Sequence, residues 1–179
     1  MTNGLVVMTP SSIAYSGTSA SINADGSVVF SACTSLSLNG VFTGDYDNYM
    51  VTVRMKMTSS VPNLYMRLRA SGTDASGSNY TRQYLTSNGT STTGNRLTSQ
   101  TEATVGFTAT AEGGTNFYVF GPYLAQPTAT RSVGVSAYAG AYLQDDACTH
   151  SLSTSYDGLT LFPSASNCTG LLTVFGFNQ

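Results

Sequence analysis

The chain alternates apolar and polar residues with a period of two in several separate stretches. The longest runs over residues 49–57, "YMVTVRMKM", where every second residue is large and apolar. This period is that of a β-strand, whose successive side chains point to opposite faces of a sheet. Shorter stretches of the same kind lie in residues 28–31, 35–38 and 64–69. We expect the apolar side of each stretch to face a core.

Further strand candidates lie between clusters of turn residues. The clusters are "NADGS", "SGTDASGSN", "SNGTSTTGN", "AEGGT" and "PSASNCTG", and Gly, Asn, Asp and Ser are typical of turns. Helical periodicity is nearly absent. The pattern predicts an all-β fold, an antiparallel β-sandwich that is jelly-roll-like, with eight to ten short strands. The additional candidates are residues 81–85, 104–110, 116–120, 131–138, 159–162 and 171–177.

The length of 179 residues indicates one domain with a substantial core. We expect residues 16–179 to form this single β-sandwich domain. Residues 1–15 hold an apolar patch from Leu5 to Met8 followed by Pro10, and they form either a first strand or an arm on a neighbouring subunit. The C-terminal "LLTVFGFNQ" reads as a core strand, so removal of even six residues should unfold the domain.

Charged residues make up only 9% of the chain, whereas Ser and Thr occupy 50 positions. A surface of hydroxyls suits β-structure and is readily buried against neighbours, because few charges must be desolvated. The net charge of -2 and the pI of about 5.0 argue against nucleic acid as a partner. No apolar run reaches membrane-spanning length, and the N-terminus lacks the basic region of a signal peptide. We expect synthesis in the reducing cytoplasm.

Asp45, Asp47 and Asn48 precede the longest strand candidate and suggest a calcium loop or an acid pair. An EF-hand loop starting at Asp45 fails, because its position 6 is Met50 and its position 12 is Lys56. A glycosidase acid pair lacks supporting residues, since the chain has no Trp. Local turn chemistry is the interpretation that the residues favour.

His150 is the only histidine, and it lies near Asp145, Asp146 and Cys148 in "QDDACTHSLS". Cys148 and His150 would share one face of an extended strand, which supplies two of the three or four ligands that zinc needs. No nucleophile motif accompanies them. We expect a solvated turn or a hydrogen-bonded histidine here, and we expect Cys33, Cys148 and Cys168 to be small buried apolar residues. We assign no catalytic, cofactor or metal site.

Four of the seven basic residues flank the segment "SSVPN". If residues 49–57 and 64–69 pair as a hairpin, these four side chains share one face of a sheet. Such a patch is either a solvated outer face or a subunit interface, where Arg and Tyr are enriched. The residues with which we expect the chain to contact neighbouring subunits or a capsid are Leu5, Val6, Val7, Met8, Arg54, Lys56, Arg67 and Arg69.

Four stretches together resemble a family of small β-rich virion proteins of tailed bacteriophages. They are "SLSLNGVFTGDYDNYMVTVRM", "LYMRLRASGTDASGSNYTRQYL", "GPYLAQPTATRSV" and "HSLSTSYDGLTLFPSASNCTGLLTVFGFN". The similarity runs from about Ser16 onward, and its markers are strand patterns rather than catalytic motifs. The resemblance implies a capsid decoration, head fibre or minor tail protein, with no cofactor and no catalytic residue.

We therefore expect a non-enzymatic virion structural protein that decorates a capsid as a homo-oligomer, with a trimer as the first guess. Its partners would be itself and the major capsid or tail proteins, with no nucleic acid and no membrane. Two alternatives remain: a minor tail or tail-fibre protein that contacts the host surface, where a glycan could be its partner, and a glycan-binding or hydrolytic module. Tyr-, Ser- and Gly-rich loops such as "SGTDASGSNYTRQY" suit adaptable recognition.

Overall fold

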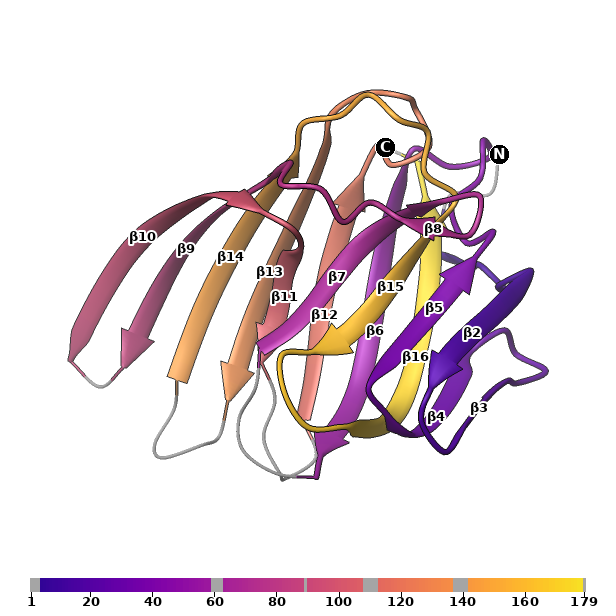
Figure 1. The fold of residues 1–179 in the computed structure, drawn as a ribbon, viewed down its shortest axis with the longest axis horizontal. Helices are drawn as coiled ribbons and strands as arrows, with labels where there is room; N and C mark the ends of the chain where they lie inside the picture. The colour runs from indigo at the N-terminus through magenta and orange to yellow at the C-terminus, as the bar shows by residue number, and fades with distance from the viewer. Residues whose placement is uncertain (1–3, 59–62, 89, 108–112, 137–141, 179) are drawn as a thin grey trace.

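The computed structural model describes residues 4–58, 63–88, 90–107, 113–136 and 142–178. Over these residues the regular elements are all strands, and they form two antiparallel sheets that pack face to face (Figure 1). The predicted all-β antiparallel sandwich is confirmed, while its jelly-roll character stays a prediction. The described residues form sixteen strands, which is more than the eight to ten expected.

The larger sheet has ten strands, with β1 paired to β16 beside the main path. Along that path the order is β10-β9-β14-β13-β12-β6-β16-β4-β3. The bounds are β1 Val6–Val7, β3 Ser19–Ile22, β4 Val28–Cys33, β6 Asn48–Met57, β9 Tyr80–Asn88, β10 Ser91–Gln100, β12 Gly113–Phe120, β13 Thr128–Ser136, β14 Tyr142–His150 and β16 Cys168–Phe177.

The smaller sheet has six strands in the order β11-β7-β15-β5-β2, with β8 paired to β7. It covers only part of the larger sheet, because β9 and β10 extend beyond its edge strand β11 (Figure 1). The bounds are β2 Ser12–Ser16, β5 Ser35–Asn39, β7 Asn63–Ala70, β8 Thr73–Asp74, β11 Ala103–Phe107 and β15 Gly158–Pro163.

The core lies between the sheets and follows the predicted alternation. In β6 the side chains of Tyr49, Val51, Val53, Met55 and Met57 are all buried, and the residues between them are half-buried or exposed. In β7 the alternate residues from Leu64 onward are buried in the same way. The long strand candidate therefore faces the core as expected.

One side of the sandwich is closed by a bent two-stranded ribbon. The chain leaves the smaller sheet at Ser16 and enters the larger one at Ser19, while β4 runs into β5 in the opposite direction. The amide of Thr34 donates to the carbonyl of Ser16 at 2.7 Å across the bend. Gly17 sits at the corner with a φ of +154°, where a Cβ would collide with the backbone of Ala32.

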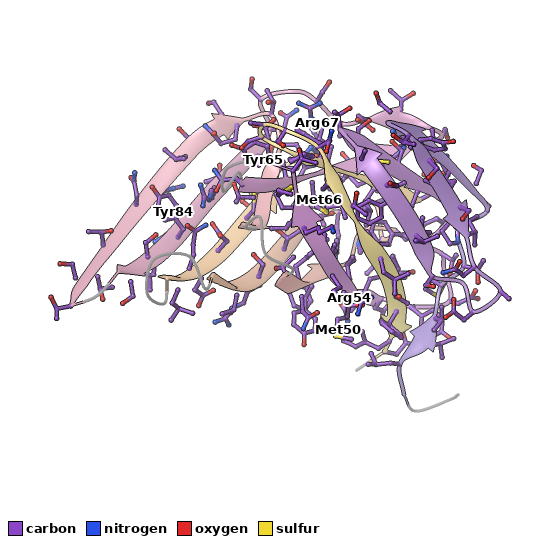
Figure 2. The ribbon with its side chains drawn as sticks, turned by 90° about the horizontal axis from the view of Figure 1, so that it is seen from below. Met50, Arg54, Tyr65, Met66, Arg67 and Tyr84 are labelled. Atoms are coloured by element: carbon purple, nitrogen blue, oxygen red, sulfur yellow. The ribbon has the colours of Figure 1, made fainter. Side chains whose placement is uncertain are left out.

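The predicted hairpin between residues 49–57 and 64–69 is wrong. β6 pairs with β12 and β16 in the larger sheet, whereas β7 pairs with β11, β15 and β8 in the smaller one. Figure 2 shows the consequence: Arg54 and Met50 lie on one side of the sandwich, Arg67 and Tyr65 lie on the other, and Met66 lies between. Alternation fixes which face of a strand is buried but not which strand it pairs with.

The predicted C-terminal core strand is β16, and it lies between β6 and β4 inside the larger sheet. β16 approaches β6 closely at Gly170, where a Cβ would collide with the carbonyl oxygen of Arg54. Parts of two predicted strands, residues 108–110 and 137–138, lie outside the described residues.

Candidate binding surface

The outer face of the larger sheet carries an unusual number of large apolar side chains. Directly opposed residues of antiparallel strands share a face, so the strand registers place these side chains on one surface. Each of them is exposed or half-buried. They are Val7, Val29, Met50, Leu85, Tyr118, Phe120, Val133, Leu143, Leu171, Phe175 and Phe177.

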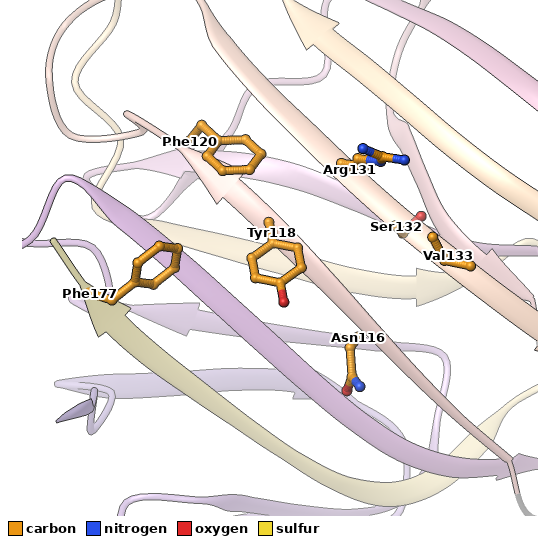
Figure 3. A pocket seen from close by; sticks show the side chains of 7 residues that line it. All are labelled: Asn116, Tyr118, Phe120, Arg131, Ser132, Val133 and Phe177. Atoms are coloured by element: carbon orange, nitrogen blue, oxygen red, sulfur yellow. The ribbon is translucent and has the colours of Figure 1, made fainter. Parts of the chain in front are cut away.

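A hollow of 520 Å³ lies in the middle of this surface (Figure 3). The rings of Tyr118 and Phe120 lie nearly parallel, 14° apart, with centroids 6.1 Å from one another. The ring of Phe177 stands edge-on to Tyr118 at 6.3 Å. Tyr118 is 40% exposed, so part of this side chain is available to a bound group. The hollow is lined by Asn116, Tyr118, Phe120, Arg131, Ser132, Val133 and Phe177.

One ion pair stands beside the hollow. The Arg131 guanidinium donates to the Asp145 carboxylate at 3.0 Å, and the side chains are 62% and 36% exposed. Its hydrogen bond and charge interaction with Asp145 raise the pKa of Arg131. Because both side chains are exposed to solvent, this ion pair adds little to the stability of the single chain. It gives the apolar surface one cation and one anion that can be shared with a partner.

The predicted contact residues do not form one patch. Arg54 and Lys56 are exposed on the outer face of the larger sheet, where they line a second hollow of 260 Å³ with Val29 and Leu171. Arg67 lies on the outer side of the smaller sheet, where it stacks on Phe162 at 4.7 Å and pairs with Glu102 at 3.2 Å.

Arg69 is buried, which corrects its expected place on a shared basic face. Its guanidinium donates to Thr160 at 2.9 Å, to Asn39 at 3.1 Å and to Ser37 at 3.2 Å, and it pairs with Asp74. These contacts make Arg69 an internal cross-link between strands of the smaller sheet.

The N-terminal apolar patch lies on its own chain in this structure. Val6 and Val7 pair with Gly176 and Phe175 of β16, and the Met8 amide donates to the Val174 carbonyl at 2.8 Å. Leu5 and Val7 remain exposed. Because Val7 lies opposite Phe175, it continues the outer apolar surface by one strand.

Asp45 and Asp47 lie in an exposed turn, as the turn interpretation predicts. The Thr43 hydroxyl donates to the Asp45 carboxylate at 3.2 Å, and the Asp47 amide donates to the side chain of Asn178 at 2.9 Å. The buried Tyr49 hydroxyl anchors this turn, because it accepts from the Thr43 amide at 2.7 Å. Burial raises the pKa of Tyr49, so its hydroxyl stays neutral.

His150 ends β14 and is buried, so of the two expected states the solvated turn is wrong and the structure has the hydrogen-bonded histidine. Its Nδ1 lies 3.2 Å from the Tyr156 hydroxyl, and its Nε2 has no hydrogen-bond partner among the described residues. Burial lowers the pKa of His150. Burial also raises the pKa of the neighbouring Cys148 thiol to about 12. The three cysteines are buried and free, as predicted.

Asp145 and Asp146 are adjacent in sequence but face opposite sides of the sheet. Asp146 is buried against Arg82 at 2.6 Å and accepts from Gln144 at 2.5 Å. Burial raises the pKa of Asp146, and the hydrogen bonds from Arg82 and Gln144 oppose that rise. Arg82 also lies over the Tyr84 ring at 4.1 Å. This buried pair braces β9 against β14.

Over the described part of the chain, no three His, Cys, Asp or Glu side chains converge as a metal site would require. The same residues contain no helix with the length and apolarity to cross a bilayer. No protein-family model and no curated protein matches the chain. The geometry of the outer surface offers apolar and aromatic burial together with the exposed Arg131–Asp145 ion pair.

The sequence carries a signal for this surface. "FYVF" in β12 and "LLTVFGF" in β16 are apolar at consecutive positions rather than at alternate ones. Strands with apolar residues on both faces are typical of strands that are covered on both sides. Here the smaller sheet covers one side, and the outer face of the larger sheet is the other.

Proposed function

We propose that the chain is a non-enzymatic structural protein of a bacteriophage virion that decorates the capsid and bridges neighbouring subunits. The observation that carries this proposal is the outer apolar surface of the larger sheet. Apolar surface of this extent, rimmed by polar groups, is characteristic of faces that another protein covers. Its aromatic, Met and Arg content, with few acids, is that of an interface core.

Two further features support an assembly role. The chain has few charges and many hydroxyls, so contact with neighbours requires little desolvation of ions. The strand patterns resemble those of small virion proteins of tailed bacteriophages. Leu5 and Val7 at the exposed N-terminal strand remain candidates for the capsid contact, together with Arg54 and Lys56.

In this role the geometry acts by burial. Each 100 Å² of apolar surface that a neighbour covers contributes on the order of 2.5 kcal/mol before the costs of association. A decoration protein that contacts adjacent capsomers in this way opposes their separation under internal pressure. The protein would act as a homo-oligomer located on the virion.

The test is to locate the chain in purified particles and to delete its gene from the phage. We expect antibody labelling on heads, and we expect deleted virions to lose infectivity faster on heating, with recovery when the protein is supplied. Labelling confined to tails would replace the decoration role with a minor tail role. Absence from particles would remove the proposal.

The aromatic hollow favours a second candidate, a tail or fibre protein that binds a host-surface glycan. The nearly parallel Tyr118 and Phe120 rings offer flat apolar faces, and Asn116 lies two residues before Tyr118 on the same face. Binding of soluble oligosaccharides that is lost in a Tyr118→Ala variant would favour this candidate.

A further inference from the structure

We propose that the outer face of the six neighbouring strands β6, β12, β13, β14, β9 and β10 packs against the same face of a second copy of this chain. The two copies are related by a two-fold axis that runs parallel to the strands, between β13 and β14. This inference rests on the proposed assembly role of the surface, and it names the occupant. Three observations lead to it: an exposed leucine and a hollow at matched positions, a self-complementary ion pair, and the size of the face.

The strand registers place four outward side chains in one row across the sheet. Asn116 lies opposite Val133, Val133 opposite Asp145, and Asp145 opposite Leu85. The row therefore crosses β12, β13, β14 and β9 in that order. Its ends differ in shape, because Asn116 lines the hollow at one end and Leu85 projects at the other.

Leu85 is the most exposed large apolar side chain among the described residues, at 56%. It lies three strands from β12, which is about 14 Å at the usual strand spacing. A two-fold axis midway between β12 and β9 brings Leu85 of each copy over the hollow of the other. This reciprocity is what a two-fold interface requires, since residue i contacts j and j contacts i.

The charges near this axis are also self-complementary. Arg131 lies on β13 and Asp145 on β14, one on each side of the axis and two residues apart along the strands, and their side chains lean together to 3.0 Å. The two-fold places Arg131 of one copy next to Asp145 of the other, so two cations and two anions alternate around the axis. Farther out, Arg96 on β10 comes opposite Met50 on β6 rather than opposite another cation. Opposite charges across a closely packed interface fix its register.

The face is large enough for a stable dimer. The strands β6, β12, β13, β14, β9 and β10 are neighbours, and each has eight to ten residues. At the usual spacing and rise these dimensions give on the order of 800 Å² on each copy. That is the area per partner of a standard specific interface. Two sheets that pack face to face in this way lie about 10 Å apart.

The first test is the mass of the purified full chain in solution, measured by size-exclusion chromatography with light scattering across a dilution series. We expect a dimer. Leu85→Asp should weaken its dissociation constant by about 30-fold or more, because it puts a charge into the partner's hollow. The matched control is Leu152→Asp, at a similarly exposed leucine outside these strands, which should leave the dimer intact.

The second test reverses the charges at the axis. Arg131→Asp and Asp145→Arg should each weaken the dimer, and the double variant should dimerise with itself. Mixed with the wild-type chain, the double variant should form no heterodimer, because Arg then faces Arg and Asp faces Asp. A role of the pair within one chain only would instead allow mixed dimers. Differently tagged copies expressed together and recovered through one tag give this readout.

A monomer, a trimer, or a dimer indifferent to Leu85→Asp would overturn the inference. A monomer that binds oligosaccharide through Tyr118 would assign the surface to a glycan instead. The tests of the two-fold dimer and the tests of the virion role can fail independently of each other. A chain found on virions but monomeric in solution overturns only the two-fold contact. A dimer that is absent from virions overturns only the virion role.

Discussion

At the scale of single residues, Arg69 shows how a charge can serve the fold. Its side chain is 10% exposed and is satisfied by Asp74, Thr160, Ser37 and Asn39. Replacing Arg69 with Gln removes the counter-ion of Asp74, which keeps the Thr160 hydroxyl as a donor, and it removes the guanidinium that donates to Thr160 and Ser37. Loss of one partner of a buried pair costs about 3–5 kcal/mol. We expect Arg69→Gln to lower the free energy of unfolding by that amount, measured by urea denaturation.

The control for this prediction is Lys56→Gln on the exposed face of β6. An exposed charge away from buried groups changes stability by less than about 0.5 kcal/mol. Similar stabilities of the two variants would contradict the internal role of Arg69. The comparison also matters for tests of assembly. A charge reversal at Arg69 would destabilise the fold, so a loss of assembly in that variant would not identify an interface.

At the scale of elements, β16 joins β4 and β3 to the rest of the larger sheet. Removing residues 174–179 deletes the partners of the first four residues of β6 and of the whole of β1. It also deletes Val174, which is buried in the core. The lost pairing and burial rival the roughly 5–15 kcal/mol of net stability of a domain. We expect the truncated chain to show no cooperative thermal transition by calorimetry.

A chain shortened at the other end provides the control for that truncation. Starting the protein at Leu5 removes no strand of either sheet, so the transition temperature should stay within a few degrees. A cooperative transition in the chain without residues 174–179 would show that β16 is dispensable. The prediction that loss of six C-terminal residues unfolds the domain would then be wrong.

The elements also show how far the sequence alone could reach. β6, β7 and the end of β16 were predictable, because their buried side chains alternate with outward ones. The sequence predicts a turn where β10 begins, since "STTGN" is polar and the strand is exposed on nearly all its length. β14 was missed, because its buried residues include Gln144, Asp146 and His150, and polar residues give no apolar period. Both strands lie where the smaller sheet gives little apolar cover.

The outer apolar surface of the larger sheet was beyond prediction for a different reason. Asn116, Val133, Asp145 and Leu85 are spread over four strands and meet only through long-range register. Alternation shows that each faces outward, but it gives neither strand order nor pairing. The false hairpin of β6 and β7 came from the same gap. Strands with apolar residues on both faces, such as "FYVF", are the local sign in the sequence of an apolar outer face.

At the scale of the whole molecule, the single histidine makes stability depend on pH. His150 is 2% exposed and packs edge-on against the Tyr80 ring, with centroids 4.4 Å apart. Burial lowers its pKa below the usual 6.5 of the unfolded chain. The unfolded state therefore takes up a proton first as the pH falls. The contribution of His150 is fully present above about pH 6.5 and declines below it, until the pH reaches the folded pKa.

The pH dependence can be isolated by comparing the wild type with His150→Phe. We expect the wild-type free energy of unfolding to fall from pH 7 to pH 5 by up to about 1.4 kcal/mol per pH unit. The variant loses the hydrogen bond to Tyr156 and is less stable at pH 7, but its curve should lack this slope. The raised pKa of Asp146 acts with the opposite sign, and it is common to both proteins, so it cancels in the comparison. Parallel curves in urea denaturation from pH 5 to 7 would show that His150 is protonated equally in the folded and unfolded states, and the buried, neutral histidine would then be wrong.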